Sequence, residues 1–349
     1  MILGKSSVFG LDIGSNSIKL IELKLSKNGY ELKNIGVTSL PPQSIVNKAI
    51  NNHDAVADSI SSLLEDLRIK TKNVVISVSG NSVIIKKVTL PKMSDNELVE
   101  SIPWELEQYI PQSINDVNYD YQVLPGETPE GNMDVLIVAA KKDITDDYIS
   151  VASAVGLNPV MVDVDVFALE NMYEINYFDT IGMLALVNIG ASITNINILS
   201  NGLSVFTRDI NTGGNQFTEW ISKELNTDFE EAEKMKFNIG DGDGSGDVNR
   251  IANDFSDLIC GEIKRTIDFF SSTLTKDKIE RIMIGGGSSL VPSIGENLEE
   301  MTETKVEVIN PFNNIDFNTS EFDSEYLSAT APKMCVAVGL ALRRPGDKQ

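Results

Sequence analysis

Two short glycine turns, placed about half a chain apart, are the residues with the clearest capacity for chemistry. The segments Leu11-Asp-Ile-Gly-Ser15 and Val187-Asn-Ile-Gly-Ala191 both end an apolar run at a polar residue, pass through a glycine and lead into a second apolar run. Glycine lets a ligand approach the backbone, and successive amides in such a turn donate hydrogen bonds to phosphate oxygens. The repeat predicts two similar domains whose turns face one cleft.

Charged residues accompany only the first turn. The carboxylate of Asp12 can hold Mg²⁺ through water, since Mg²⁺ prefers carboxylate oxygen and retains several of its waters. Lys19 can reach a phosphate from the following strand, although a solvent-facing lysine is the alternative interpretation. Two later glycine clusters, Gly213-Gly214 and Gly285-Gly286-Gly287-Ser288, also follow apolar runs and suit a phosphate or an adenosine. For each cluster, a tight connection is the alternative.

The elements that must position these turns alternate between strands and helices. Apolar runs predict strands at 8–14, 18–24, 31–40, 74–78, 185–189, 193–199, 203–210, 279–284 and 305–309. The dipeptide Asn201-Gly202 predicts a hairpin turn between two of them. Helical spacing of apolar residues predicts helices at 54–67, with Asp54 as its N-cap, at 228–238, over about 251–270 and at 333–344. An acidic loop at 240–247 resembles a calcium loop but lacks the closing glutamate, so we expect a solvated loop.

The region 84–158 has a different texture. A strand over 83–90 ends at Pro91, and the capping-box pattern of Ser94 and Glu97 opens a helix toward Ile110 in which Pro103 predicts a kink or a late start. A hairpin over 117–124 and 134–140 and a helix over 143–155 follow. We expect this block to be an inserted subdomain.

Composition excludes several classes of function. The net charge of −22 repels nucleic acid and anionic lipid, although a local site of amides and Mg²⁺ can still bind a nucleotide. The single histidine, His53, and two cysteines without ligand spacing disfavour a metal centre or a histidine-based triad. No apolar stretch approaches the roughly 20 residues of a membrane span, so we expect no direct membrane insertion.

Taken in order, these motifs resemble the superfamily of actin, Hsp70 and sugar kinase ATPases. Within it the chain is most similar to the PilM family of type IV pilus assembly proteins, which is related to the division protein FtsA. The segments that carry the resemblance are 9–19, 104–111, 116–124, 187–192, 212–218, 229–236 and 284–288. They span nearly the whole chain, and Glu107-Gln-Tyr-Ile-Pro111 is the most family-specific.

The resemblance implies an α/β, two-lobed actin-like (ribonuclease H-like) ATPase fold with an inserted subdomain. The first lobe would comprise 1–83 and 159–184, with the insertion at 84–158. The second lobe would comprise 185–225 and 278–332, with a cap at 226–277, and the helix of 333–349 would return to the first lobe.

It also implies an ATP and Mg²⁺ site between the lobes. The phosphate-binding residues would be Asp12, Gly14, Ser15, Asn16, Ser17, Lys19, Asn188, Gly190, Ala191, Ser192, Gly213 and Gly214, with Asp12 holding Mg²⁺ through water. The adenosine-binding residues would be Glu233, Lys236, Gly285, Gly286, Gly287 and Ser288. The family's second turn usually begins with aspartate, whereas this chain has Asn188, which cannot serve as a base. We therefore expect nucleotide binding with slow or absent hydrolysis.

The function implied by the family is that of a cytoplasmic scaffold of the pilus assembly platform. Such proteins sit at the inner membrane by gripping the N-terminal cytoplasmic tail of PilN, and they meet other platform and motor proteins. Two alternatives are a division-type actin like FtsA and a metabolic kinase of the same fold. The first needs a linker and a membrane helix after 343–349, and the second needs a sugar-facing aspartate that the sequence does not place.

Overall fold

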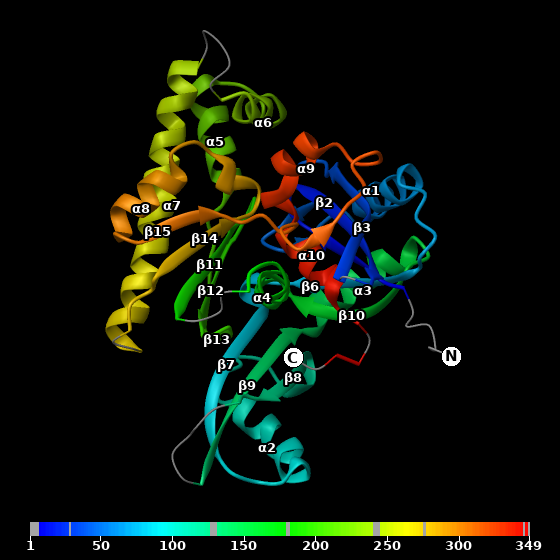
Figure 1. The fold of residues 1–349 in the computed structure, drawn as a ribbon, viewed down its shortest axis with the longest axis vertical. Coiled ribbons are helices and arrows are strands. Elements are labelled where there is room, and N and C mark those ends of the chain that lie inside the picture. Colours follow the sequence, from blue (N-terminus) through cyan, green and yellow to red (C-terminus); the bar gives the residue numbers. More distant parts are fainter. Residues whose placement is uncertain are drawn as a thin grey trace.

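Two mixed β-sheets form the bodies of two lobes, and a third, smaller sheet projects from them (Figure 1). The computed structural model describes residues 7–27, 29–125, 131–178, 182–239, 245–274, 277–344 and 346–347. Residues 240–244 of the expected acidic loop lie outside this described part.

The first sheet has six strands in the order β10-β6-β1-β2-β3-β16. Its strands are β1 (Phe9–Ile13), β2 (Ser17–Ser26), β3 (Gly29–Ser39), β6 (Asn73–Val78), β10 (Asn158–Val164) and β16 (Ile315–Asp316). Strand β1 is buried along its whole length, pairing antiparallel with β2 and parallel with β6. Apart from Asp12 its residues are apolar, as expected for a strand with helices on both faces of the sheet.

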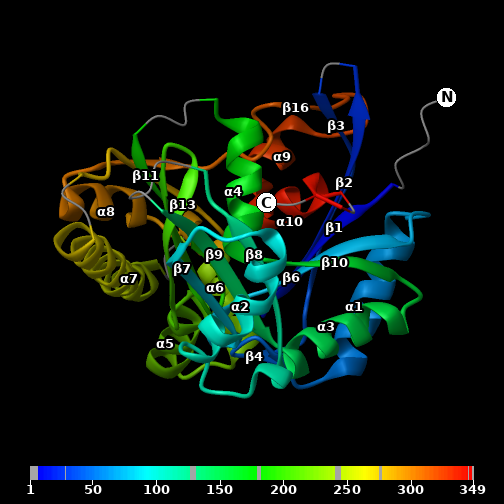
Figure 2. The same cartoon turned by 90° about the horizontal axis from the view of Figure 1, so that it is seen from below.

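Helices α1 (His53–Asp66) and α3 (Lys142–Ala154) cover one face of this sheet (Figure 2). Helices α4 (Asp165–Asn176) and α10 (Cys335–Leu342) pack between the two large sheets and share one apolar core with both. The two helices cross so closely that a Cβ on Gly339 would lie 1.7 Å from the carbonyl oxygen of Ala168. Only glycine fits that crossing.

The second sheet has five strands in the order β13-β12-β11-β14-β15. Its strands are β11 (Met183–Ile189), β12 (Thr194–Ser200), β13 (Leu203–Ile210), β14 (Arg281–Gly285) and β15 (Lys305–Val308). Around it lie α5 (Gly214–Leu225), α6 (Phe229–Phe237), α7 (Ser245–Thr273) and α8 (Ile294–Thr302). The predicted hairpin turn Asn201-Gly202 is confirmed, with both residues at positive φ.

The third sheet, in the order β7-β9-β8, carries α2 and a separate apolar core. Its elements are β7 (Val83–Pro91), α2 (Asp95–Glu107), β8 (Val117–Val123) and β9 (Asn132–Lys141). The capping box of Ser94 and Glu97 is present in full, and α2 begins directly after it. The expected late start caused by Pro103 is therefore wrong.

Other details also differ from the sequence prediction. The N-cap of α1 is Asn52, whose side chain accepts from the amide of Ala55, and not Asp54. Helix α3, which the sequence groups with the inserted block, packs its apolar side on the first sheet. The sequence analysis did not predict β10, α4, the hairpin of β4 (Ile45–Val46) and β5 (Ala49–Ile50), β16 or α9 (Ser324–Thr330). Within the described residues, no helix has the length and apolar character to cross a bilayer.

Candidate functional site

The first glycine turn joins β1 to β2 at the edge that faces the second lobe. The Gly14 amide donates to the Ser17 carbonyl at 3.1 Å and closes the turn. Asp12 and Lys19 are register partners on the two strands, and the Lys19 ammonium donates to the Asp12 carboxylate at 3.0 Å. Both side chains are largely buried, so the turn presents an enclosed lysine–aspartate pair.

The second turn, between β11 and β12, repeats this geometry with neutral side chains. The Gly190 amide donates to the Ile193 carbonyl at 3.0 Å. Asn188 and Asn195 occupy the register positions that Asp12 and Lys19 hold in the first lobe, and the Asn188 amide donates to Asn195 at 3.2 Å. The second turn thus has amide dipoles where the first has charges.

A cavity of about 290 Å³ lies between the two turns. Four lysines and three carboxylates are among its described lining residues, namely Lys19, Lys48, Lys236, Lys333, Asp12, Asp165 and Glu233. The local balance is therefore positive in a chain whose net charge is −22. Such a cavity suits an anionic ligand that the rest of the surface would repel.

A polar cluster from α5 and α6 forms one wall of the cavity. The Lys236 ammonium donates to Glu233 at 3.0 Å and to the carbonyl of Gly214 at 3.1 Å. Burial lowers the pKa of Lys236, against the opposing effect of Glu233. The Asn16 amide of the first turn donates to Glu233 at 2.8 Å, which joins the two lobes across the cavity.

Most of the predicted site residues line this cavity. The lining includes Asp12, Gly14, Ser15, Asn16, Ser17, Lys19, Asn188, Gly190, Ala191, Ser192, Glu233, Lys236, Gly286, Gly287 and Ser288. Gly213, Gly214 and Gly285 are not in the lining.

Those three glycines allow close packing of the elements around the cavity. A Cβ on Gly213 would lie 2.5 Å from the carbonyl oxygen of Gly190, and one on Gly214 would lie 2.3 Å from the hydroxyl of Ser288. A Cβ on Gly285 would lie 2.9 Å from the sulfur of Cys335. They hold neighbouring elements together, and the expectation that they contact the ligand stays a prediction.

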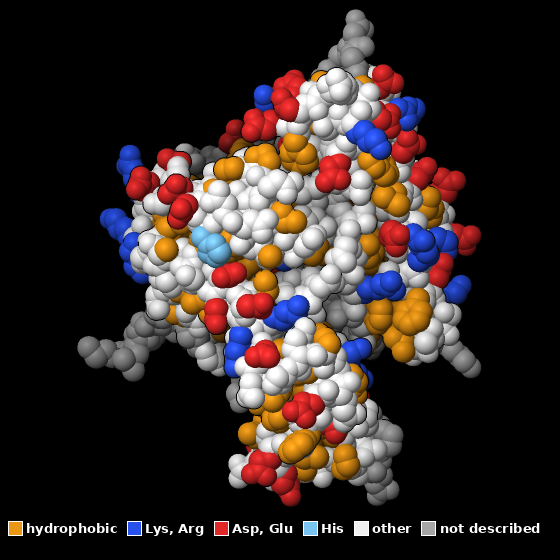
Figure 3. Space-filling model, turned by 180° about the vertical axis from the view of Figure 1, so that it is seen from behind, with side chains coloured by type: hydrophobic (Ala, Val, Ile, Leu, Met, Phe, Trp, Pro, Cys, Tyr) orange, Lys and Arg blue, Asp and Glu red, His pale blue; other side chains and the backbone are white. Residues whose placement is uncertain are grey.

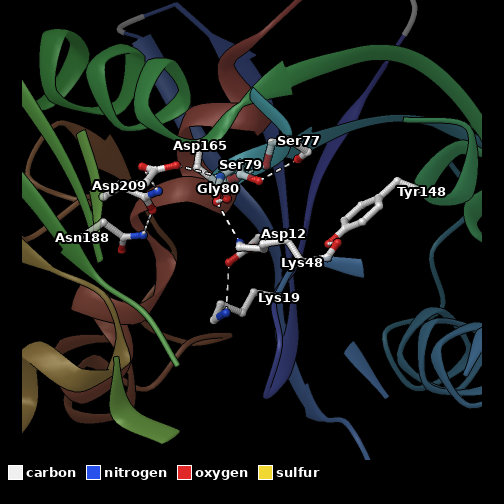
Figure 4. Close-up of polar contacts among 12 residues, drawn as sticks. Asp12, Lys19, Lys48, Ser77, Ser79, Gly80, Tyr148, Asp165, Asn188 and Asp209 are labelled. Atoms are coloured by element: carbon white, nitrogen blue, oxygen red, sulfur yellow. Dashed lines mark hydrogen bonds and ion pairs between the residues drawn. The ribbon is translucent and has the colours of Figure 1, made fainter. Parts of the chain in front are cut away.

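The sequence analysis missed a second lysine–aspartate pair, Lys48 and Asp165, among the residues that line the cavity (Figure 4). The Lys48 ammonium donates to Asp165 at 3.0 Å, and the hydroxyls of Ser77 and Ser79 donate to the same carboxylate at 2.6 Å each. Burial acts to raise the pKa of Asp165, but Lys48 and the two serines outweigh it and lower the pKa. Burial likewise acts to lower the pKa of Lys48, and Asp165 raises it. Both groups are therefore charged.

A groove of about 710 Å³ separates the projecting β7–β9 sheet from the first lobe. Its described lining comes from α2, β8, β9, β10 and α4, and includes Leu98, Val99, Val123, Val138, Val162 and Phe167. Val99 is 55% exposed, and further apolar side chains are exposed on the projecting unit (Figure 3). The ion pair of Asp163 with Arg343, at 3.4 Å, lies in the groove.

Two facing lobes with matched glycine turns define this molecule as a two-lobed actin-like ATPase fold. The structure of MreB 5 of Spiroplasma citri bound to AMPPNP has the same fold, at 13% identity over 96% of this chain and 95% of that chain, with a TM-score of 0.53. The predicted fold class is confirmed.

The chain belongs to the family described as type IV pilus assembly protein PilM, whose model matches residues 10–345. It is similar to a solved chain of a PilM–PilN type IV pilus biogenesis complex, at 27% identity over 99% of this chain and all of that chain, with a TM-score of 0.89. The cell division protein FtsA of Streptococcus pneumoniae is 23% identical over 347 residues, covering 86% of this chain and 75% of FtsA.

Proposed function

We propose that this protein binds ATP with Mg²⁺ in the cavity between its lobes. The observation that supports this most directly is the convergence of two glycine turns and four lysines on one cavity in an acidic chain. Backbone amides and lysine ammonium groups donate hydrogen bonds to phosphate oxygens. MreB 5, which shares the fold, was solved with AMPPNP.

In this proposal Asp12 is the residue that binds the metal. Its carboxylate lines the cavity beside Lys19 and is the group that would hold Mg²⁺ through water. Mg²⁺ would supply charge neutralisation of the phosphates. Glu233 and Lys236, with Gly286 to Ser288, form the wall that we assign to the ribose and adenine.

Hydrolysis is slow or absent in this proposal. The second turn presents Asn188, whose side-chain amide donates a hydrogen bond to Asn195. An asparagine neither accepts a proton from water nor adds a charge for the metal. The bound nucleotide then serves to hold the lobes together.

We further propose that the groove beside the β7–β9 sheet binds the N-terminal cytoplasmic segment of a PilN-type membrane protein. The similar solved chain is part of a PilM–PilN complex and aligns along its whole length. The groove offers apolar side chains and an exposed strand, β8, at the edge of the sheet, which together suit an extended peptide. The β7–β9 sheet and α2, which belong to the block expected at 84–158, would form one wall of the groove.

This contact would bring the protein to the cytoplasmic face of the inner membrane. There it would act as a scaffold that also meets other platform and motor proteins of the pilus.

The peptide proposal is tested by titrating a labelled peptide of a PilN-type N-terminal segment into the full chain and following its fluorescence anisotropy. We expect saturable binding that a scrambled peptide does not reproduce. Val99→Asp, which puts a charge on the apolar wall, should weaken the binding. Equal binding of both peptides would overturn the proposal.

A further inference from the structure

The β4–β5 hairpin places a lysine where the backbone favours glycine. Its two-residue turn consists of Asn47, at φ 49°, and Lys48, at φ 67°, between the paired residues Val46 and Ala49. Such a turn needs the left-handed conformation at both positions, which favours asparagine first and glycine second. Because a lysine backbone is strained there, a role for its side chain is the hypothesis that the strain suggests.

The side chain of Lys48 is held in one place. It is 14% exposed and its ammonium contacts Asp165, which is 5% exposed and itself held by two serine hydroxyls. The hydroxyl of Tyr148, on α3, donates to the Lys48 carbonyl at 3.2 Å and secures the turn. An ammonium has three N–H donors, and the contact with Asp165 uses one.

This pair is held by other contacts than the proposed adenosine wall. Lys48 contacts Asp165, whereas Glu233 contacts Lys236 and Asn16. Asp12, which pairs with Lys19, acts electrostatically on Lys48. Figure 4 shows the Lys48–Asp165 pair beside Asp12 and on a different element from Lys19.

A nucleotide whose base lies against Glu233 and Lys236, and whose phosphate chain passes Lys19 and Asp12, reaches Lys48 last. The group that then lies at Lys48 is the terminal phosphate of a triphosphate. A diphosphate would end before it. Asp165 keeps the ammonium charged and oriented in the absence of ligand, so little reorganisation is needed when the phosphate arrives.

We propose that Lys48, oriented by Asp165, contacts the terminal phosphate and makes the cavity select a nucleoside triphosphate over the diphosphate. This inference rests on the proposed nucleotide site. Lys48 is thus a specificity-determining residue, with Asp165 as its positioning residue.

The test compares Mg–ATP and Mg–ADP binding by calorimetry for the wild type and for the variant Lys48→Met/Asp165→Asn. This variant removes both charges together, so that no buried charge is left without a partner. Because the variant loses one charged hydrogen bond to the terminal phosphate, we expect its ATP affinity to fall on the order of tenfold. Its ADP affinity should change by no more than about twofold. Should the methionine variant unfold, Lys48→Gly/Asp165→Asn carries the same test, because glycine relieves the positive φ.

A matched control is the pair of Lys33 and Glu22. It is also a buried carboxylate with a lysine and two neutral donors, Thr71 and Asn34, but it does not line the cavity. The variant Lys33→Met/Glu22→Gln should leave the ratio of ATP to ADP affinity unchanged. An unchanged ratio in the Lys48 variants would overturn the inference while the nucleotide site stands, whereas failure of the wild type to bind either nucleotide would overturn both.

Discussion

Replacing Asp12 by asparagine should separate the contribution of the metal from that of the phosphates. Asp12 is the second-last residue of β1, is 8% exposed and pairs with Lys19 at 3.0 Å. Asparagine keeps the size and still accepts a hydrogen bond from Lys19, but it removes the charge. Since the side chain lines the cavity and not the apolar core, we expect the fold to persist.

The expected magnitude follows from the way Asp12 would hold the metal. Loss of a group that acts on a metal through its water shell costs roughly 10–100-fold in affinity, which is about 1.4–2.7 kcal/mol. Without Mg²⁺ the effect of the substitution on ATP affinity has the opposite sign, because the Asp12 carboxylate then repels the phosphates and neutralises Lys19. In EDTA the asparagine variant should therefore bind ATP at least as tightly as the wild type.

Calorimetric titration of ATP into both proteins, with Mg²⁺ and with EDTA, measures all four affinities. Asp163→Asn is the matched control, since Asp163 is 7% exposed, pairs with Arg343 and lies outside the cavity. Its affinities should equal those of the wild type in both conditions. An Asp12 variant that loses the same factor with and without Mg²⁺ would refute the assignment of Asp12 to the metal.

Three further outcomes are expected. The wild type should show very slow ATP turnover in a phosphate-release assay, and Asn188→Asp should raise it; rapid turnover by the wild type would contradict the argument from the missing carboxylate. Val99→Asp should weaken peptide binding about tenfold or more and leave ATP binding intact, whereas Val308→Asp, at a similarly exposed valine outside the groove, should change neither. Burial raises the pKa of Glu170, in α4, from 4.5 to about 7, so between these pH values the folded state keeps a proton that the unfolded state has lost. As the pH rises through that interval, the free energy of unfolding of the wild type should therefore fall by up to about 3 kcal/mol relative to that of Glu170→Gln. Thermal unfolding of both proteins between pH 5 and 8 checks the last, and parallel profiles would contradict it.

The features that the sequence predicted are those set by neighbours in the chain. A glycine turn between two apolar runs, as at Gly14 and Gly190, needs only local backbone conformation and two strands that pair with each other. The capping box of Ser94 and the turn at Asn201-Gly202 are equally local. The position of α3 could not be predicted this way, because it depends on which sheet its apolar side meets.

Helix α4 shows why part of the site was not predictable. Both large sheets and α10 surround it, so apolar residues occur all round it and the helical period that marks a half-exposed helix is lost. Its first residue, Asp165, stands 117 positions after Lys48 in the chain. Neither residue has a partner in its own segment, since the aspartate follows an apolar strand and the lysine sits in a polar turn. Their pairing, and with it the positive balance of the cavity, arises only when β4, β5 and α4 converge on the ends of the first sheet. The glycine turns are therefore the part of the site that the sequence predicts. The Lys48–Asp165 pair, to which we assign the selectivity, becomes visible only in the folded structure.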